Sequence, residues 1–177
     1  ISTVAVGITF TALMHPTKGL LNHVIEFWGG TGINWLGDTK IALYSVILTD
    51  VWKGVGIATV IFIAGMQSID KTFYEAAAID GATSWQSLKS ITVPLSRPAM
   101  NSIIILSFIG GLRTFDLIWA MTGGGPGYAT EVMASTVYKQ YAAGYYGLST
   151  AGNVIMFVLI AVLAFPLQKF LLSKEVE

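Results

Sequence analysis

Long apolar runs restrict the possible folds of this chain more than any other feature. Residues 41–66, 98–121 and 150–172 form three such runs. Each is long enough to cross a bilayer, since a helix needs ~20 residues to span a hydrocarbon core of ~30 Å. Inside a bilayer the backbone must satisfy its own hydrogen bonds, which favours helices over open sheets. We therefore predict an all-α, polytopic membrane protein with three full spans. Residues 1–14 are apolar but shorter, and they predict part of a fourth span.

Composition agrees with a membrane protein and excludes several functions. The sequence is 54% hydrophobic and 11% charged, whereas soluble domains are about 25% charged. The formal net charge is zero, so the chain offers no basic field to nucleic acid. It contains no cysteine, and we interpret His15 and His23 as loop or interfacial residues. We expect no catalytic residue, metal site, cofactor or nucleic-acid partner.

The chain reads as one unit of organisation. We find no repeat and no second domain, so a single transmembrane domain is predicted over residues 1–177. Because Ile1 opens directly inside an apolar run, we expect the C-terminal portion of a longer polypeptide. Glycine and proline at residues 123–127 cannot continue a helix and should end the third run in a loop. The simplest role for this loop is to close the third and fourth spans together.

A polar segment, residues 67–97, joins the runs 41–66 and 98–121, and we name it the connecting segment. Thr72 with Glu75, and Thr83 with Gln86, both fit the capping-box pattern that begins a helix. The segment is therefore predicted to hold two short helices.

Glycine and alanine define the shape of the connecting segment. Gly81 lies between the two predicted helices and should end the first of them. Residues 76–78 are three alanines, strong helix formers with almost no bulk, so another protein could approach this helix closely. This pattern indicates a docking element, and a connector that merely lies on the membrane surface is the alternative.

Basic residues indicate which side of the membrane the connecting segment faces. If it is cytoplasmic, the inner segments contain five lysines and arginines, and the outer segments contain three. The inner residues are Lys71, Lys89, Arg97, Lys169 and Lys174, and the outer ones are Lys18, Lys40 and Lys139. The positive-inside rule then favours a cytoplasmic connecting segment.

Polar and small residues inside two of the runs predict a substrate cavity. Such residues are costly in a span and often functional, and helical spacing should place each set on one face near the bilayer midplane, where transporter sites lie. Packing between helices is the alternative, because small residues also mark helix interfaces. The first set is Asp50, Lys53 and Gly54, and the second is Ser107, Gly110, Gly111 and Thr114.

The connecting segment closely resembles the EAA loop of ABC importer permeases. The residues that carry this resemblance are Glu75-Ala76-Ala77-Ala78-Ile79-Asp80-Gly81-Ala82 and then Ile91-Thr92-Val93-Pro94-Leu95. Further stretches are similar to the carbohydrate branch, in particular to subunits of the maltose and glycerol-phosphate transporter type. These stretches are residues 52–56, 64–69, 115–116 and 121–126.

The resemblance implies the membrane subunit of a type I importer in a prokaryotic inner membrane. Its partners would be a dimer of ATP-binding subunits, a second permease subunit, an extracytoplasmic solute-binding protein and a carbohydrate. In this family the EAA segment is the helix that docks on the ATPase. Carried onto this chain, Glu75 forms the ion pair, Ala76 and Ala77 allow close packing, and Asp80 and Gly81 end the helix.

Gly110 and Gly111 stand where the maltose type has side-chain amides, so the resemblance does not carry the family's sugar contacts onto these two positions. The resemblance also gives the glycine-rich loop a second possible role, which is to face the binding protein.

Three other functions are alternatives to that of an importer subunit: an embedded enzyme, a secondary transporter and a structural membrane module. The chain contains no GxSxG and no P-loop, so an embedded enzyme is disfavoured and ATP would be bound by another chain. An ATP-independent secondary transporter and a structural membrane module remain as alternatives. Dependence of transport on ATP and on a partner ATPase would distinguish them from the importer.

Overall fold

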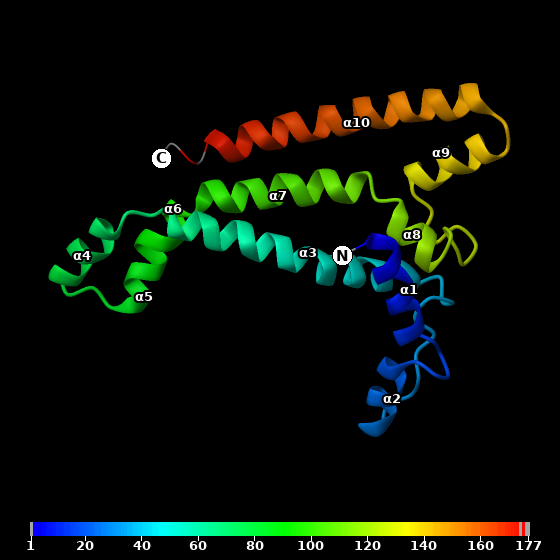
Figure 1. The fold of residues 1–177 in the computed structure, drawn as a ribbon, viewed down its shortest axis with the longest axis horizontal. Helices are drawn as coiled ribbons and strands as arrows, with labels where there is room; N and C mark the ends of the chain where they lie inside the picture. Colours follow the sequence, from blue (N-terminus) through cyan, green and yellow to red (C-terminus); the bar gives the residue numbers. More distant parts are fainter. Residues whose placement is uncertain (1, 174, 176–177) are drawn as a thin grey trace. The chain divides into compact units, whose positions relative to one another are not determined.

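The computed structural model of the chain describes residues 2–173 and 175, and its regular elements are all helical, as predicted. Figure 1 shows them in chain order. They are α1 (Thr3–Leu13), α2 (Leu20–Phe27), α3 (Ala42–Gln67), α4 (Lys71–Ile79), α5 (Ser84–Ser87), the π-helix η1 (Leu88–Thr92), α6 (Val93–Leu95), α7 (Arg97–Leu112), α8 (Asp116–Met121), α9 (Met133–Ala142) and α10 (Tyr146–Ser173).

Two helices of the described chain are long and apolar enough to cross a membrane alone. They are α3, with 26 residues, and α10, with 28 residues. The pair formed by residues 84–95 and α7 passes the same test together, although it bends by 57°. The prediction for residues 41–66 agrees with α3 within one residue at each end, and the predicted run 150–172 lies inside α10.

The run at residues 98–121 differs from the predicted single helix. α7 ends at Leu112 and α8 begins at Asp116. Two adjacent glycines, Gly110 and Gly111, weaken the helix here, since each costs about 1 kcal/mol relative to alanine. Phe115 then leaves helical geometry (φ −133°, ψ −58°), and its ring stacks on Trp119 with centroids 5.6 Å apart. Aromatic packing thus accompanies the break.

The helices group into two compact units, which we describe separately. The first unit comprises residues 1–53 and 112–159. Its core lies where α1 meets α8, and a Cβ added at Gly7 would lie only 2.8 Å from the Cβ of Ala120. The start of α3 contributes a buried face at helical spacing, Ala42, Ser45, Val46 and Thr49. The apolar core is made of Val6, Met14, Val46, Leu117, Ile118 and Met121.

A buried amide organises the loops of the first unit around α2. Asn22 is 2% exposed, and its side chain forms four hydrogen bonds. Its Nδ2 donates to the carbonyls of Pro16 and Ile33, while its Oδ1 accepts from the Ile33 N–H and from Trp35 Nε1. The short helix α2 and the loops on either side of it are therefore held together by one fully satisfied polar group.

The second unit comprises residues 54–111 and 160–177, of which the structure describes all but 174, 176 and 177. Here the end of α3 meets the start of α7, because a Cβ added at Gly65 would overlap the Cβ of Ala99. In Figure 1, α4 and α5 extend beyond this junction. The Asn101 amide donates to the carbonyl of Leu171 at 3.1 Å, and this hydrogen bond joins α7 to the end of α10.

Candidate functional site

The first helix of the connecting segment, α4, is capped by Asp70. The Asp70 carboxylate accepts hydrogen bonds from the N–H of Thr72 at 2.9 Å and from its hydroxyl at 3.0 Å. These hydrogen bonds, the backbone one foremost, lower the pKa of Asp70. The predicted capping box of Thr72 and Glu75 is therefore wrong. Aspartate is an acceptor-only group and a preferred N-cap, so the helix begins at Lys71 and Thr72 becomes a donor.

The end of α4 is a Schellman motif built on Gly81. The Ala82 N–H donates to the Ala77 carbonyl at 2.9 Å, and the Gly81 N–H donates to Ala78 at 3.1 Å. Gly81 has φ +74°, a left-handed conformation that costs an L-residue about 1–2 kcal/mol. The predicted stop at Gly81 is confirmed.

The second helix, α5, begins as the sequence predicts. Thr83 and Gln86 form a complete capping box. The Gln86 side chain accepts from the Thr83 N–H at 2.7 Å, and the Gln86 N–H donates to the Thr83 hydroxyl at 3.4 Å. The connecting segment is thus a helix-turn-helix whose two ends and turn are all defined by local hydrogen bonds.

The outer surface of this helix-turn-helix is exposed and partly apolar. Glu75 and Ala76 are exposed on α4, and Glu75 forms no ion pair with any of the described residues. Ile79 is 87% exposed and Trp85 is 72% exposed. Large apolar side chains displayed beside an unpaired carboxylate have the chemistry of a protein-docking surface.

The structure divides the predicted cavity residues between the two units. Asp50, Lys53 and Thr114 belong to the first unit, and Gly54, Ser107 and Gly111 belong to the second. Asp50 and Gly54 are four residues apart on α3 and share a face, as predicted. Thr114 lies beyond the end of α7, so its predicted place on the same helix face as Ser107 is wrong. The helix ends at Leu112, directly after the two adjacent glycines that weaken it.

Four glycines of α3 and α7 have open space beside them. A Cβ added at Gly54, Gly56, Gly110 or Gly111 would meet no atom within 4 Å. This contrasts with Gly65, which contacts α7 directly. Within the second unit, helix packing therefore does not account for glycines 54, 110 and 111.

A cavity of about 340 Å³ lies between α9 and α10, and none of the predicted cavity residues lines it. Its lining is mainly apolar. The lining residues are Glu131, Val132, Met133, Thr136, Val137, Gly152 and Ile155.

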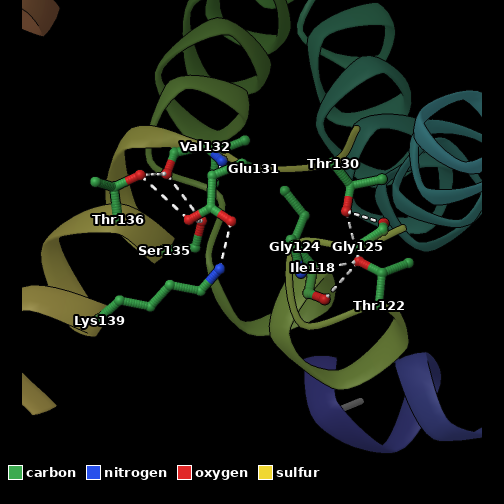
Figure 2. A network of polar contacts seen from close by, with 10 residues as sticks. All are labelled: Ile118, Thr122, Gly124, Gly125, Thr130, Glu131, Val132, Ser135, Thr136 and Lys139. Atoms are coloured by element: carbon green, nitrogen blue, oxygen red, sulfur yellow. Dashed lines mark hydrogen bonds and ion pairs between the residues drawn. The ribbon is translucent and has the colours of Figure 1, made fainter. Parts of the chain in front are cut away.

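Two polar networks follow α8, and no sequence pattern predicted them (Figure 2). In the first, the fully buried Thr130 hydroxyl donates to the Gly125 carbonyl and lies 2.7 Å from the Thr122 hydroxyl. These contacts close the glycine-rich loop on itself. Thr122 and Thr130 both lie between α8 and α9, outside any helix, so no helical or strand periodicity related them.

The second network surrounds Glu131 (Figure 2). Its carboxylate accepts hydrogen bonds from Lys139 Nζ, from the Ser135 hydroxyl at 3.1 Å and from the Thr136 hydroxyl at 3.2 Å. Burial raises the pKa of Glu131, but the hydrogen bonds from Lys139 and Ser135 and the charge of Lys139 outweigh it, so the pKa lies below its ordinary value. The network fixes the start of α9.

Among the described residues, no three His, Asp or Glu side chains gather as a metal site.

Comparison with known sequences identifies similar proteins over nearly the whole chain. A family described as "Binding-protein-dependent transport system inner membrane component" matches residues 1–175. The trehalose/maltose transport system permease protein MalF of Thermococcus litoralis is 37% identical over 160 residues, 90% of this chain and 54% of that protein. The multiple sugar-binding transport system permease protein MsmF of Streptococcus mutans is 35% identical over 143 residues, 80% of this chain and 49% of that protein. The chain thus spans about half the length of these curated relatives.

Solved structures share the fold. A bacterial ABC transporter involved in the import of the acidic polysaccharide alginate matches with a TM-score of 0.85 at 24% identity, covering 98% of this chain and 61% of that one. A bacterial alginate ABC transporter in complex with an alginate pentasaccharide-bound periplasmic protein matches with a TM-score of 0.79 at 26% identity, covering 97% of this chain and 59% of that one.

Proposed function

The chain belongs to the family of binding-protein-dependent transport system inner membrane components, and from this premise we propose that it is part of the permease subunit of an ATP-driven sugar importer. The observation that carries the proposal is the connecting segment, a capped helix-turn-helix with Glu75 and Ala76 exposed on its first helix. In this function the segment docks on an ATP-binding subunit, and the chain forms half of the translocation pathway with a second permease subunit. The location is a prokaryotic inner membrane, crossed several times.

Docking would use the exposed face of α4. Glu75 has no ionic partner among the described residues, so a basic residue of the ATPase can pair with it. The small side chains of Ala76 and Ala77 let a partner approach the helix backbone. Asp80 and Gly81 end the helix, and the Schellman turn at Gly81 reverses the chain toward α5.

The substrate class follows from the relatives. The names of similar proteins refer to trehalose, maltose and multiple sugars, which supports a carbohydrate as the cargo of this chain. Its path would pass the faces of α3 and α7 that carry Asp50, Lys53, Gly54, Ser107 and Gly111, with Thr114 at the break beyond α7. The open space beside the glycines is compatible with this role. The periplasmic protein named in one structural relative supports delivery by a solute-binding protein.

Transport by the complete complex in vesicles tests the docking role. We expect Glu75→Ala to lower ATP-driven sugar uptake by roughly tenfold or more, because loss of a charge-assisted contact is worth about 1.5–3 kcal/mol. Gly81→Val should also lower uptake, because a β-branched residue is strained at φ +74° and distorts the turn that ends α4. Membrane insertion, measured by the amount of permease extracted from membranes, should not change. Lys89→Gln, a charge change elsewhere in the same segment, is the matched control. Full uptake in both docking variants would show that the segment does not couple to an ATPase.

A further inference from the structure

A tyrosine joins the two halves of the connecting segment. Tyr74 lies on α4, directly before Glu75, and its hydroxyl is 3.0 Å from the hydroxyl of Thr92, the last residue of η1. Both side chains are half-buried in a segment whose other residues are mostly exposed. This side-chain hydrogen bond links α4 to η1, although the two residues are 18 positions apart in the sequence.

Backbone hydrogen bonds continue from Thr92 into α7. The Ser96 N–H donates to the Thr92 carbonyl at 3.0 Å, and the Met100 N–H donates to the Ser96 carbonyl at 3.1 Å. These bonds cross the 57° bend between residues 84–95 and α7. Ser96 itself is 1% exposed. The bend therefore keeps a helical hydrogen-bond pattern and a buried residue at its centre, which makes it a defined joint.

The turn at Gly81 is held only by the local backbone hydrogen bonds of the Schellman motif. No atom lies within 4 Å of a Cβ added there, and residues 78–81 are exposed. A force applied to α4 could therefore rotate it about this turn unless another contact holds it. The Tyr74–Thr92 hydrogen bond is that contact, because it closes a loop of 18 residues around the turn.

We infer that Tyr74 and Thr92 are positioning residues for energy coupling. Their hydrogen bond makes α4 and the start of α7 move together, so that displacement of a docked ATPase reaches the span. This inference rests on the proposed function, since it requires α4 to be the docking helix. Neither residue contacts the ATPase or the substrate in this role, and each acts through the orientation of α4.

The test compares transport with ATP hydrolysis in the complete complex in vesicles. Tyr74→Phe and Thr92→Val each remove one hydroxyl at nearly constant shape. We expect the number of sugar molecules imported per ATP hydrolysed to fall by roughly threefold to tenfold in each, the range that loss of one hydrogen bond produces. The double variant should be no worse than either single one, because the two residues make one interaction. Thr92→Ser keeps the hydroxyl and should restore the ratio.

Two controls separate the possible outcomes. Tyr44→Phe changes an exposed tyrosine of α3 whose hydroxyl has no hydrogen bond among the described residues, and it should leave the ratio unchanged. Glu75→Ala tests docking itself. If Glu75→Ala lowers uptake while Tyr74→Phe and Thr92→Val keep the wild-type ratio, this inference is overturned and the proposed function stands. If Glu75→Ala also has no effect, the proposed function fails.

A purely structural role has its own signature. In that case the amount of ATPase that co-purifies with the permease would fall in Tyr74→Phe and Thr92→Val, and uptake and hydrolysis would fall in proportion. The ratio would then be constant, which contradicts the inference. A reduced ratio with unchanged co-purification supports it.

Discussion

At Glu131 the fold holds a carboxylate in its charged form. Three side chains donate to it, and its side chain is 16% exposed. Hydrogen bonds to charged groups contribute about 1.5–3 kcal/mol, so we expect Glu131→Gln to destabilise the permease by roughly 1–2 kcal/mol at neutral pH. Thermal unfolding of the purified protein in detergent measures this.

The destabilisation caused by Glu131→Gln should depend on pH, because the pKa of Glu131 is lowered in the folded state. Because the folded state holds the proton of Glu131 less tightly than the unfolded chain does, the stabilisation is complete above the ordinary value of 4.5. It decreases as the pH falls below that value and through the lower pKa of the folded state. The difference in melting temperature between wild type and Glu131→Gln should therefore narrow toward acid. Glu26→Gln, which alters an exposed carboxylate 3.8 Å from His23, is the control and should change little. If the difference in melting temperature between wild type and Glu131→Gln stays constant with pH, the pKa of Glu131 is not lowered in the folded state.

Residue-level contacts were the least predictable part of the molecule. The hydrogen bonds between Thr83 and Gln86 could be predicted from the sequence, because a capping box involves residues only three positions apart. Asn22 could not, since its partners lie 6 to 13 residues away in loops. The cap at Asp70 could not be chosen from the sequence because the threonine two residues later offers an equally regular pattern, and only the extended backbone at Asp70 distinguishes the two.

Among the elements, small residues mark the places where helices touch. Gly7 meets Ala120 between α1 and α8, and Gly65 meets Ala99 between α3 and α7. Glycine and alanine let backbones approach closely, which is how helices pack inside membranes. Glycine therefore has two roles on α3, because Gly65 makes a contact and Gly56 faces open space.

This difference predicts opposite effects of one substitution at two positions of α3. Leucine is a better helix former than glycine by about 0.8 kcal/mol, so Gly56→Leu should leave the melting temperature unchanged or raise it. Gly65→Leu gains the same propensity but overpacks the contact with Ala99, and we expect a net destabilisation of about 1–3 kcal/mol. Thermal unfolding of the two variants side by side measures the effect. Equal stability would mean that Gly65 is not a packing contact.

Helix lengths were easier to predict than helix breaks. The long apolar run predicted the bounds of α3 within one residue at each end, and the polar residues Asp50 and Lys53 within it do not interrupt the helix. The run at residues 98–121 is also apolar, yet it breaks after Leu112. Its two glycines indicate a weak point in the helix, but the position of the break coincides with the packing of Phe115 against Tyr138, a contact between distant parts of the chain that the sequence does not show.

For the whole molecule, burial is unevenly distributed. The buried core lies in the first unit, whereas Ser96 is the only buried residue among those described in the second unit. The most apolar windows of α3 and α10 are 11% and 0% buried. Apolar helices with so little internal cover need lipid or another subunit around them. The fold class could be predicted from the long apolar runs that produce this surface. The residues that line the pathway could not be predicted, because the sequence does not show whether lipid, another subunit or substrate covers a given helix face.

A matched set of glycine variants distinguishes a pathway face from a lipid face. Gly54 and Gly111 lie on the proposed substrate faces, and all three glycines, Gly56 included, have open space for a side chain. We expect Gly54→Leu and Gly111→Leu to lower sugar uptake roughly tenfold, in line with the 1–3 kcal/mol that overfilling a site costs. Gly56 lies two residues beyond Gly54, on the opposite side of α3, so Gly56→Leu should transport normally. ATP hydrolysis and co-purification of the second permease subunit are measured in parallel. If Gly54→Leu or Gly111→Leu instead prevents co-purification, that glycine faces the second subunit, and the pathway assignment is wrong for that helix.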